Sequence, residues 1–119
     1  MDYNNDFSHD LLVGQIAEEY LGELLENKKI EVKHDKIAHK TNRVFVEFEC
    51  RGKLSGISTT EADFWAFVFV TGVIILVDKQ RLMALCNTQW PDGKIVNGGD
   101  MNTSRGFLID IDDLIRGII

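Results

Sequence analysis

The sequence has little proline, little cysteine and no long apolar run. One proline and two cysteines occur among its 119 residues. The longest apolar stretch, FWAFVFVTGVIILV, has 14 residues and is interrupted by Thr-Gly, whereas a membrane-spanning helix needs about 20. Cys50 and Cys86 fit no metal or redox spacing, which is typical of reduced thiols in a cytosolic protein. No basic segment followed by an apolar one opens the sequence, so we expect no signal peptide, no membrane partner and a cytoplasmic location.

The sequence also lacks repeats, linkers and low-complexity tracts. Its length suits one domain with one core, so residues 1–119 are assigned to a single domain. Hydrophobic residues make up 45% and charged residues 27%, which excludes a disordered chain and indicates a globular one. The three histidines, His9, His34 and His39, are not spaced as a metal triad, and we expect His34 to face the core.

Basic residues are concentrated in one part of an acidic chain. The net charge of −6 argues against a nucleic-acid partner. Residues 28–53, however, hold eight basic and four acidic residues, a balance of +4, and the remaining residues hold five basic and fifteen acidic ones, a balance of −10. This pattern favours a polyanion held over metal ions, although lysines on a solvated hairpin would give the same balance. The residues predicted to contact nucleic acid are Lys36, Lys40, Arg43, Arg51 and Lys53.

The order of predicted elements indicates an α/β domain with a mixed central sheet flanked by helices. Apolar residues at helical spacing predict a helix over 11–26, capped by Ser8 or Asp10, with Glu18 at the edge of its apolar arc. Glu18 would be either a solvated boundary residue or a functional acid. The later predictions are a short helix TEADFWAF and strands FVFV and VIILV around Thr71-Gly72, with a tight hairpin as one arrangement of the two strands. A capped helix DKQRLMALCN, a long loop over 87–104, a strand GFLIDI and a helix DDLIRGII follow.

Two strands of alternating pattern carry most of the ionisable groups. In IEVKHD, at residues 30–35, Ile30 and Val32 are predicted to face the core, and Glu31, Lys33 and Asp35 the other side. Residues 43–51 alternate in the same way, with Val44, Val46, Phe48 and Cys50 predicted inward and Phe45, Glu47, Glu49 and Arg51 outward. If the two strands pair as a hairpin, Glu31 lies opposite Glu47 at about 5 Å, close enough to share one divalent ion.

Carboxylates in this arrangement suit Mg²⁺ or Mn²⁺, because hard cations prefer oxygen ligands. A metal so held polarises a phosphoryl oxygen and lowers the pKa of a bound water. Lys33 follows Glu31 by two residues and therefore projects from the same strand face, where it can hold the attacking water or stabilise developing negative charge. Glu-x-Lys alone occurs by chance in many proteins, so the pairing with Glu47 and the basic surround carry the hypothesis.

The segment IEVKHDKIAHKTNRVFVEFECRGKLSGISTTEADFW resembles the PD-(D/E)XK nuclease superfamily, which includes restriction endonucleases and Holliday-junction resolvases, and is most similar to its small phage-type members. The resemblance covers residues 14–70 and implies a restriction-endonuclease-like core, a bacterial or phage setting and a DNA endonuclease, with branched or recombining DNA as a substrate. It implies that Glu18, in GQIAE, is a metal ligand. Glu31-Val32-Lys33 matches the (D/E)-x-K element.

The chain departs from that pattern, because no Pro-Asp precedes the motif. In one alignment Glu31 and Lys33 are the (D/E)-x-K pair and Glu47 supplies the missing acid. In the other, Glu31 replaces the first Asp, and Glu47-Phe48-Glu49 is a variant with Glu in place of Lys. The predicted catalytic residues are Glu31, Lys33 and Glu47, and the predicted metal ligands are Glu18, Glu31, Asp35, Glu47 and Glu49.

Two functions stay open at this point. The first is a Mg²⁺- or Mn²⁺-dependent DNA endonuclease, and the second is a nucleic-acid-binding or assembly protein with the same fold and a degenerate site. A domain this small covers few base pairs, so cutting both strands of a duplex or junction would require a homodimer. The apolar segment DDLIRGII is a candidate dimer contact, although core packing would explain its composition equally well.

Overall fold

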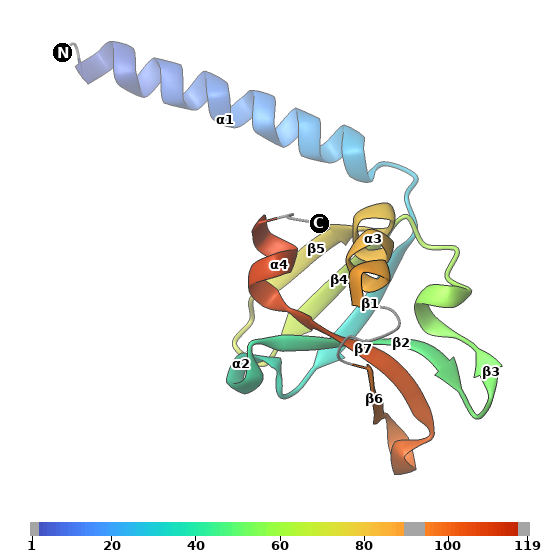
Figure 1. Ribbon diagram of the computed structural model, residues 1–119. Coiled ribbons are helices and arrows are strands. Elements are labelled where there is room, and N and C mark those ends of the chain that lie inside the picture. Colours follow the sequence, from blue (N-terminus) through green and yellow to red (C-terminus); the bar gives the residue numbers. More distant parts are fainter. Residues whose placement is uncertain (1–2, 90–94, 117–119) are drawn as a thin grey trace.

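The computed structural model describes residues 3–89 and 95–116 and has a mixed α/β architecture (Figure 1). A long helix comes first, followed by strands and short helices in alternation. The elements in chain order are α1 Tyr3–Leu25, β1 Ile30–Asp35, α2 Ala38–Thr41, β2 Arg43–Cys50, β3 Lys53–Leu54, the 3-10 helix η1 Gly56–Ser58, β4 Phe64–Phe69, β5 Ile74–Asp78, α3 Lys79–Gln89, β6 Ile95–Gly98, the 3-10 helix η2 Asp100–Asn102, β7 Ser104–Asp110 and α4 Ile111–Arg116.

The strands form two sheets. One is a mixed sheet of three strands in the order β1-β4-β5, in which β1 and β4 are parallel and β4 and β5 antiparallel. The other is an antiparallel sheet of four strands in the order β3-β2-β7-β6. The expected mixed sheet and flanking helices are therefore present, but the strands do not join into one central sheet.

The predicted hairpin between residues 30–35 and 43–51 is wrong. β1 pairs with β4, which places Glu31 beside Trp65, and β2 pairs with β7, which places Glu47 beside Gly106. Parallel strands require a crossover, and here residues 36–63 provide it. β4 reads FWAFVF and is apolar on both sides, so it takes the centre of the three-stranded sheet and leaves β1 at the edge.

The predicted orientation of β1 is also reversed. Ile30 and Val32 are exposed, whereas Glu31, Lys33 and Asp35 are half-buried. The parallel register puts these three charged residues on the face of Trp65, Phe67 and Phe69, which belong to the core. His34, predicted to face the core, is exposed. An edge strand can place long polar side chains on the core side because their heads still reach solvent at the open edge.

The core lies between the two sheets and under α3 and α4. Phe48 and Phe107 of the four-stranded sheet pack with ring centroids 4.8 Å apart, and Trp65 and Phe67 of the other sheet are fully buried. The remaining fully buried large side chains are Val44, Val46, Leu82 and Ile109. The inward alternation predicted for Val44, Val46 and Phe48 is confirmed. Burying each such side chain contributes about 1.5–3 kcal/mol.

Several other predictions concern element boundaries. The first helix begins at Tyr3, so Ser8 and Asp10 lie within it and cap nothing. TEADFWAF is not a helix, because β4 begins at Phe64. The strands on either side of Thr71-Gly72 do form a hairpin, and Asp78 caps α3 by accepting a hydrogen bond of 2.7 Å from the Gln80 amide. Part of the expected loop at 87–104 is the strand β6, and residues 90–94 and 117–119 lie outside the described residues.

The first helix projects away from the sheets (Figure 1). The radius of gyration is 17.6 Å, compared with about 13.5 Å for a compact chain of this length. The molecule measures 61 × 31 × 26 Å along its principal axes. None of the helices in the described part of the chain combines the length and the apolar composition that crossing a membrane requires.

Candidate functional site

A cleft of about 360 Å³ lies between the start of β1 and the segment that leads into β4. Glu31 lines it from β1, and Gly56, Thr59 and Thr60 line it from the opposite side. Hydrogen bonds between Lys29 and Asp63 hold the two walls together: the Lys29 amide donates to Asp63 Oδ2 at 2.9 Å, and the Asp63 amide donates to the Lys29 carbonyl oxygen at 2.8 Å. The remaining lining residues are Lys29, Ile30, Glu61 and Ala62.

Glu31 and Lys33 form an ion pair beside this cleft. Lys33 Nζ lies 3.2 Å from Glu31 Oε1 and 5.3 Å from the centroid of the Trp65 ring. Both side chains are about 40% exposed, at 42% for Glu31 and 40% for Lys33, so the pair itself adds only about 0.2–1 kcal/mol to stability. The cation–π contact restricts the lysine further. The prediction that Glu31 and Lys33 lie on the same face of the strand is therefore confirmed. The contact of Lys33 with the buried Trp65 ring was not predicted from the sequence.

Thr60, which lines the cleft, carries a hydroxyl group. Its Oγ1 accepts hydrogen bonds from the Ala62 amide at 3.2 Å and from the Trp65 indole nitrogen at 3.3 Å. A threonine hydroxyl has two acceptor lone pairs and one proton. With both lone pairs used, the group can act toward a ligand only as a donor, which suits an anion such as phosphate.

Glu47 lies on β2 and is held by two serines. Ser55 Oγ donates to Glu47 Oε2 at 2.9 Å, and Ser104 Oγ donates to Glu47 Oε1. Because both donors are neutral, they orient the carboxylate without neutralising its charge. Sequence reasoning missed both serines, and the Ser-Gly pair at 55–56 was the only local signal for one of them.

Gly56 connects the cleft to Glu47. It lines the cleft with Glu31 and packs against the backbone of Glu47, so that a Cβ at this position would lie well under 3 Å from the Glu47 carbonyl oxygen. Its φ of +54° is in the left-handed region, which glycine adopts without strain. The sequence Ser55-Gly56 is therefore required for the close approach of this segment to β2.

The other predicted metal ligands, Asp35, Glu49 and Glu18, lie on different elements and do not converge. Asp35 Oδ1 accepts hydrogen bonds from the amides of Ile37 at 3.1 Å and Ala38 at 2.9 Å, and so it stabilises the turn into α2. Glu49 lies 3.5 Å from Arg105 Nη1. Glu18 is exposed on the projecting helix α1. Over residues 3–89 and 95–116, no three His, Cys, Asp or Glu side chains gather as a metal site, so the predicted five-residue ligand set is not brought together.

The predicted nucleic-acid-binding residues are all exposed, but they form two groups. Arg43 begins β2 and pairs with Asp110 Oδ1 at 3.4 Å, and Lys36 and Lys40 lie just before it. Arg51 and Lys53 follow the other end of β2. The eight residues of this strand separate the groups by about 26 Å, so one phosphate could not contact both.

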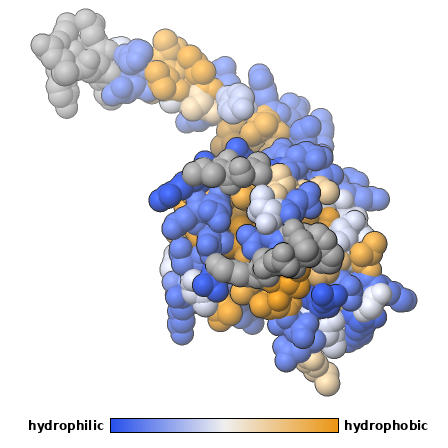
Figure 2. Space-filling model, viewed as in Figure 1, coloured by the Kyte–Doolittle hydropathy of each residue, from blue (hydrophilic) through white to orange (hydrophobic). Residues whose placement is uncertain are grey.

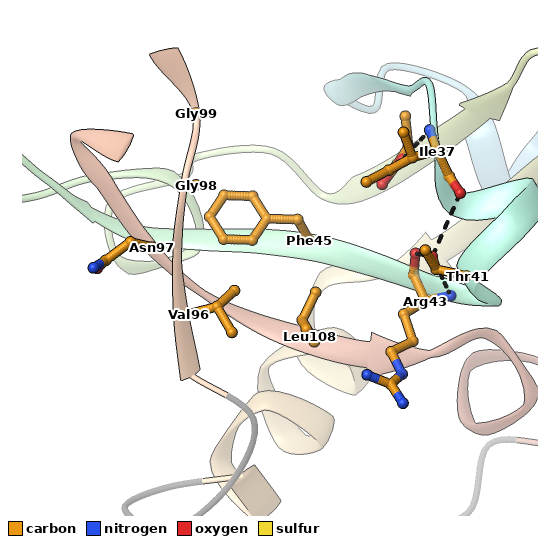
Figure 3. A pocket seen from close by; sticks show the side chains of 10 residues that line it. Ile37, Thr41, Arg43, Phe45, Val96, Asn97, Gly98, Gly99 and Leu108 are labelled. Atoms are coloured by element: carbon orange, nitrogen blue, oxygen red, sulfur yellow. Dashed lines mark hydrogen bonds between the residues drawn. The ribbon is translucent and has the colours of Figure 1, made fainter. Parts of the chain in front are cut away.

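A second hollow, of about 330 Å³, lies on the outer face of the four-stranded sheet (Figure 3). The ring of Phe45 packs against Gly98 and Gly106, where added Cβ atoms would overlap the ring. Val96 and Leu108 complete its apolar floor, and the rim is formed by Asp35, Ile37, Thr41, Arg43, Asn97 and Gly99. Phe45 was predicted only to face outward, and the glycines opposite it were not connected with it.

The two cysteines are free, as expected. Cys86 is buried in the core, and burial raises the pKa of its thiol from 9.0 to about 12. A thiol that does not ionise near neutral pH is a poor nucleophile and a poor metal ligand. Cys86 therefore has a packing role.

Comparisons of the chain with protein-family models, with curated proteins and with solved structures found no match.

Proposed function

We propose that this protein is a divalent-metal-dependent DNA endonuclease with a restriction-endonuclease-like core, and that its chemistry takes place at the cleft beside Glu31 and Lys33. The observation that carries the proposal is the Glu31–Lys33 ion pair held against Trp65 next to the cleft. A carboxylate, a cation and a hydroxyl donor lie close together there, and phosphodiester hydrolysis uses these three kinds of group. Branched or recombining DNA is the substrate class that the sequence resemblance favours.

Carboxylate oxygens at the cleft suit Mg²⁺ or Mn²⁺ as ligands. Mg²⁺ is commonly held by one or two carboxylates, with water and substrate phosphates completing its octahedron. Glu31, which is partly exposed beside the cleft, would hold the ion. Glu47 does not line the cleft, and its two carboxylate oxygens already accept hydrogen bonds from Ser55 and Ser104. When bound, the ion would polarise the phosphoryl oxygen and lower the pKa of water.

The protein's own groups would bind and stabilise the reacting phosphate. Thr60 would donate a hydrogen bond from its hydroxyl group to a phosphate oxygen, since both lone pairs of the oxygen are already used. Lys33 would turn from Glu31 toward the negative charge that develops as the water oxygen bonds to phosphorus and the bond to the leaving oxygen breaks. The two exposed basic groups at the ends of β2 would contact backbone phosphates several nucleotides apart.

The second candidate function is nucleic-acid binding without cleavage. It is favoured by the partners that the acids already have: Asp35 accepts hydrogen bonds from the turn into α2, Glu49 pairs with Arg105, and Glu31 pairs with Lys33. In this function the Glu31–Lys33 pair would only stabilise β1. The basic side chains at the two ends of β2 would bind the nucleic acid.

Cleavage of supercoiled plasmid, with Mg²⁺, with Mn²⁺ and without metal, separates the two functions. The endonuclease proposal requires metal-dependent nicking that is lost in Glu31→Gln and Lys33→Met. Asp112→Asn, an exposed acid on α4, is the matched control and should nick at the wild-type rate. If the wild type binds DNA but leaves plasmid intact with either metal, the endonuclease proposal fails and the binding function replaces it.

A further inference from the structure

One face of α1 is apolar and, apart from Leu24 in its last turn, has no partner within the described residues. Six of its side chains recur at intervals of three and four residues, so they share one face. They are between 36% and 65% exposed: Leu12, Val13, Ile16, Tyr20, Leu21 and Leu24. Figure 2 shows apolar side chains gathered on the part of α1 that stands clear of the sheets. An apolar helix face of this extent is normally buried.

The three-stranded sheet has an apolar face whose outer strands, β1 and β5, are also exposed, although Phe64 and Ala66 on its central strand are buried. Val32 of β1 is 61% exposed and Ile74 of β5 is 60% exposed. They share the face opposite the core with Ile30 and Leu76, because the register aligns Val32 with Ala66 and Ala66 with Leu76. The same chain therefore exposes an apolar helix face and an apolar sheet face.

The connection between α1 and β1 keeps the two surfaces apart within one chain. Asn27 has a φ of +57°, and the Lys28 amide donates to the Leu25 carbonyl oxygen at 3.2 Å, which ends the helix. Two residues later, Lys29 is fixed to Asp63 through hydrogen bonds of its amide and its carbonyl oxygen. So short and well-anchored a connection sets the direction in which α1 leaves the sheet. Only its last turn approaches that sheet face, where Leu24 and Phe64 line the same small hollow.

We propose that α1 of one copy covers the outer sheet face of a second copy, around Val32 and Ile74, and that the second copy's α1 covers the first in return. Such a two-fold exchange is an isologous interface. A stable interface of standard size buries about 1,200–2,000 Å² in total, which the two exchanged contacts would share. The charges agree with it: α1 has five acidic residues and no lysine or arginine, and Lys28, Lys29 and Lys36 flank β1.

The proposal is independent of the nuclease function, and it moves the expected dimer contact away from the C-terminal segment DDLIRGII. A second copy is favoured over folding back of α1 onto its own sheet because folding back would have to break the helix end at Asn27 or the anchor at Lys29.

The test is complementation between two variants of the full-length chain. Ile16→Glu places a charge on the helix face, and Val32→Lys places one on the sheet face. Sedimentation equilibrium should show a dimer for the wild type and a monomer for each variant alone. A mixture of the two should form a heterodimer, detected by its mass in native mass spectrometry, because one wild-type helix then meets one wild-type sheet and the two introduced charges attract. Gln15→Glu, on the polar side of α1, is the matched control and should remain dimeric.

Three results would overturn the proposal: a monomeric wild type, single variants that remain dimeric, or a mixture that forms no heterodimer. The last of these, together with a monomeric wild type, would indicate that α1 folds back on its own chain. Both substituted side chains are exposed in one copy, so circular dichroism should show folded variants. The milder pair Ile16→Ser and Val32→Thr should each raise the dimer dissociation constant at least tenfold, and an unchanged constant in both would also contradict the exchange.

Discussion

Replacing Gly56 by alanine should destabilise the protein through two separable effects. The first is backbone strain, because a side chain at φ +54° costs about 1–2 kcal/mol. The second is overlap of the new Cβ with the Glu47 carbonyl oxygen, and relieving such an overlap costs about 1–3 kcal/mol. We therefore expect the free energy of unfolding to fall by about 2–5 kcal/mol.

Gly52→Ala is the matched control for the strain alone. Gly52 has a φ of +79°, but a Cβ there would meet no atom within 4 Å. The two variants share the backbone penalty, so the difference between them measures how tightly the segment after β3 packs on β2. Urea unfolding followed by circular dichroism gives both values, with an unchanged slope as the sign that only stability changed. If the two variants lose equal stability, Gly56 does not hold this segment against Glu47, and the link between Glu47 and the cleft is refuted.

Four further outcomes are expected, three at the site or the basic surface and one in the core. Glu31→Gln should abolish Mg²⁺ or Mn²⁺ binding in titration calorimetry, and unchanged binding would exclude a metal site at the cleft. Lys33→Met should keep DNA affinity but lower the cleavage rate about a hundredfold or more; an unchanged rate would make this lysine a bystander and make Glu49→Ala the more damaging change. Stability should fall from about pH 9 to pH 12, because the Cys86 thiol ionises near 9 when unfolded but only near 12 when folded; Cys86→Ala should remove that part of the pH dependence. Alanine at Lys36, Lys40 and Arg51 together should flatten the salt dependence of DNA binding by about one unit of slope for each phosphate that is no longer neutralised, and an identical slope would mean that these side chains face away from DNA.

The sequence predicted best the elements whose signals are local. The alternation of Val44, Val46 and Phe48 located β2, and the apolar runs on both sides of Thr71-Gly72 predicted the β4–β5 hairpin. Asp78 before an apolar helical pattern predicted α3 and its cap. Each of these patterns lies within about ten residues, so the element that it predicts forms whatever the rest of the fold is.

The prediction failed where a local signal competed with burial. Thr59, Thr60 and Glu61 look like the start of a helix, but the following FWAF is rich in residues that favour strands and is buried on both sides. Tertiary context outweighed the capping pattern, and Thr60 binds the Trp65 indole instead. The contact between Ser104 and Glu47 could not be predicted from the sequence, because the two residues are 57 positions apart.

The alternating pattern of IEVKHD determined by itself that Glu31 and Lys33 share one face of a strand, because successive side chains of any strand point to opposite sides. It did not determine which strand would lie beside them or which face would meet the core. Those choices depended on β4, whose residues follow more than 25 positions later and which is apolar enough on both sides to occupy the centre of the sheet. Only the tertiary structure therefore placed Glu31 beside Trp65 instead of Glu47 and left Val32 exposed, since the energy of burying a central strand comes from contacts distant in sequence.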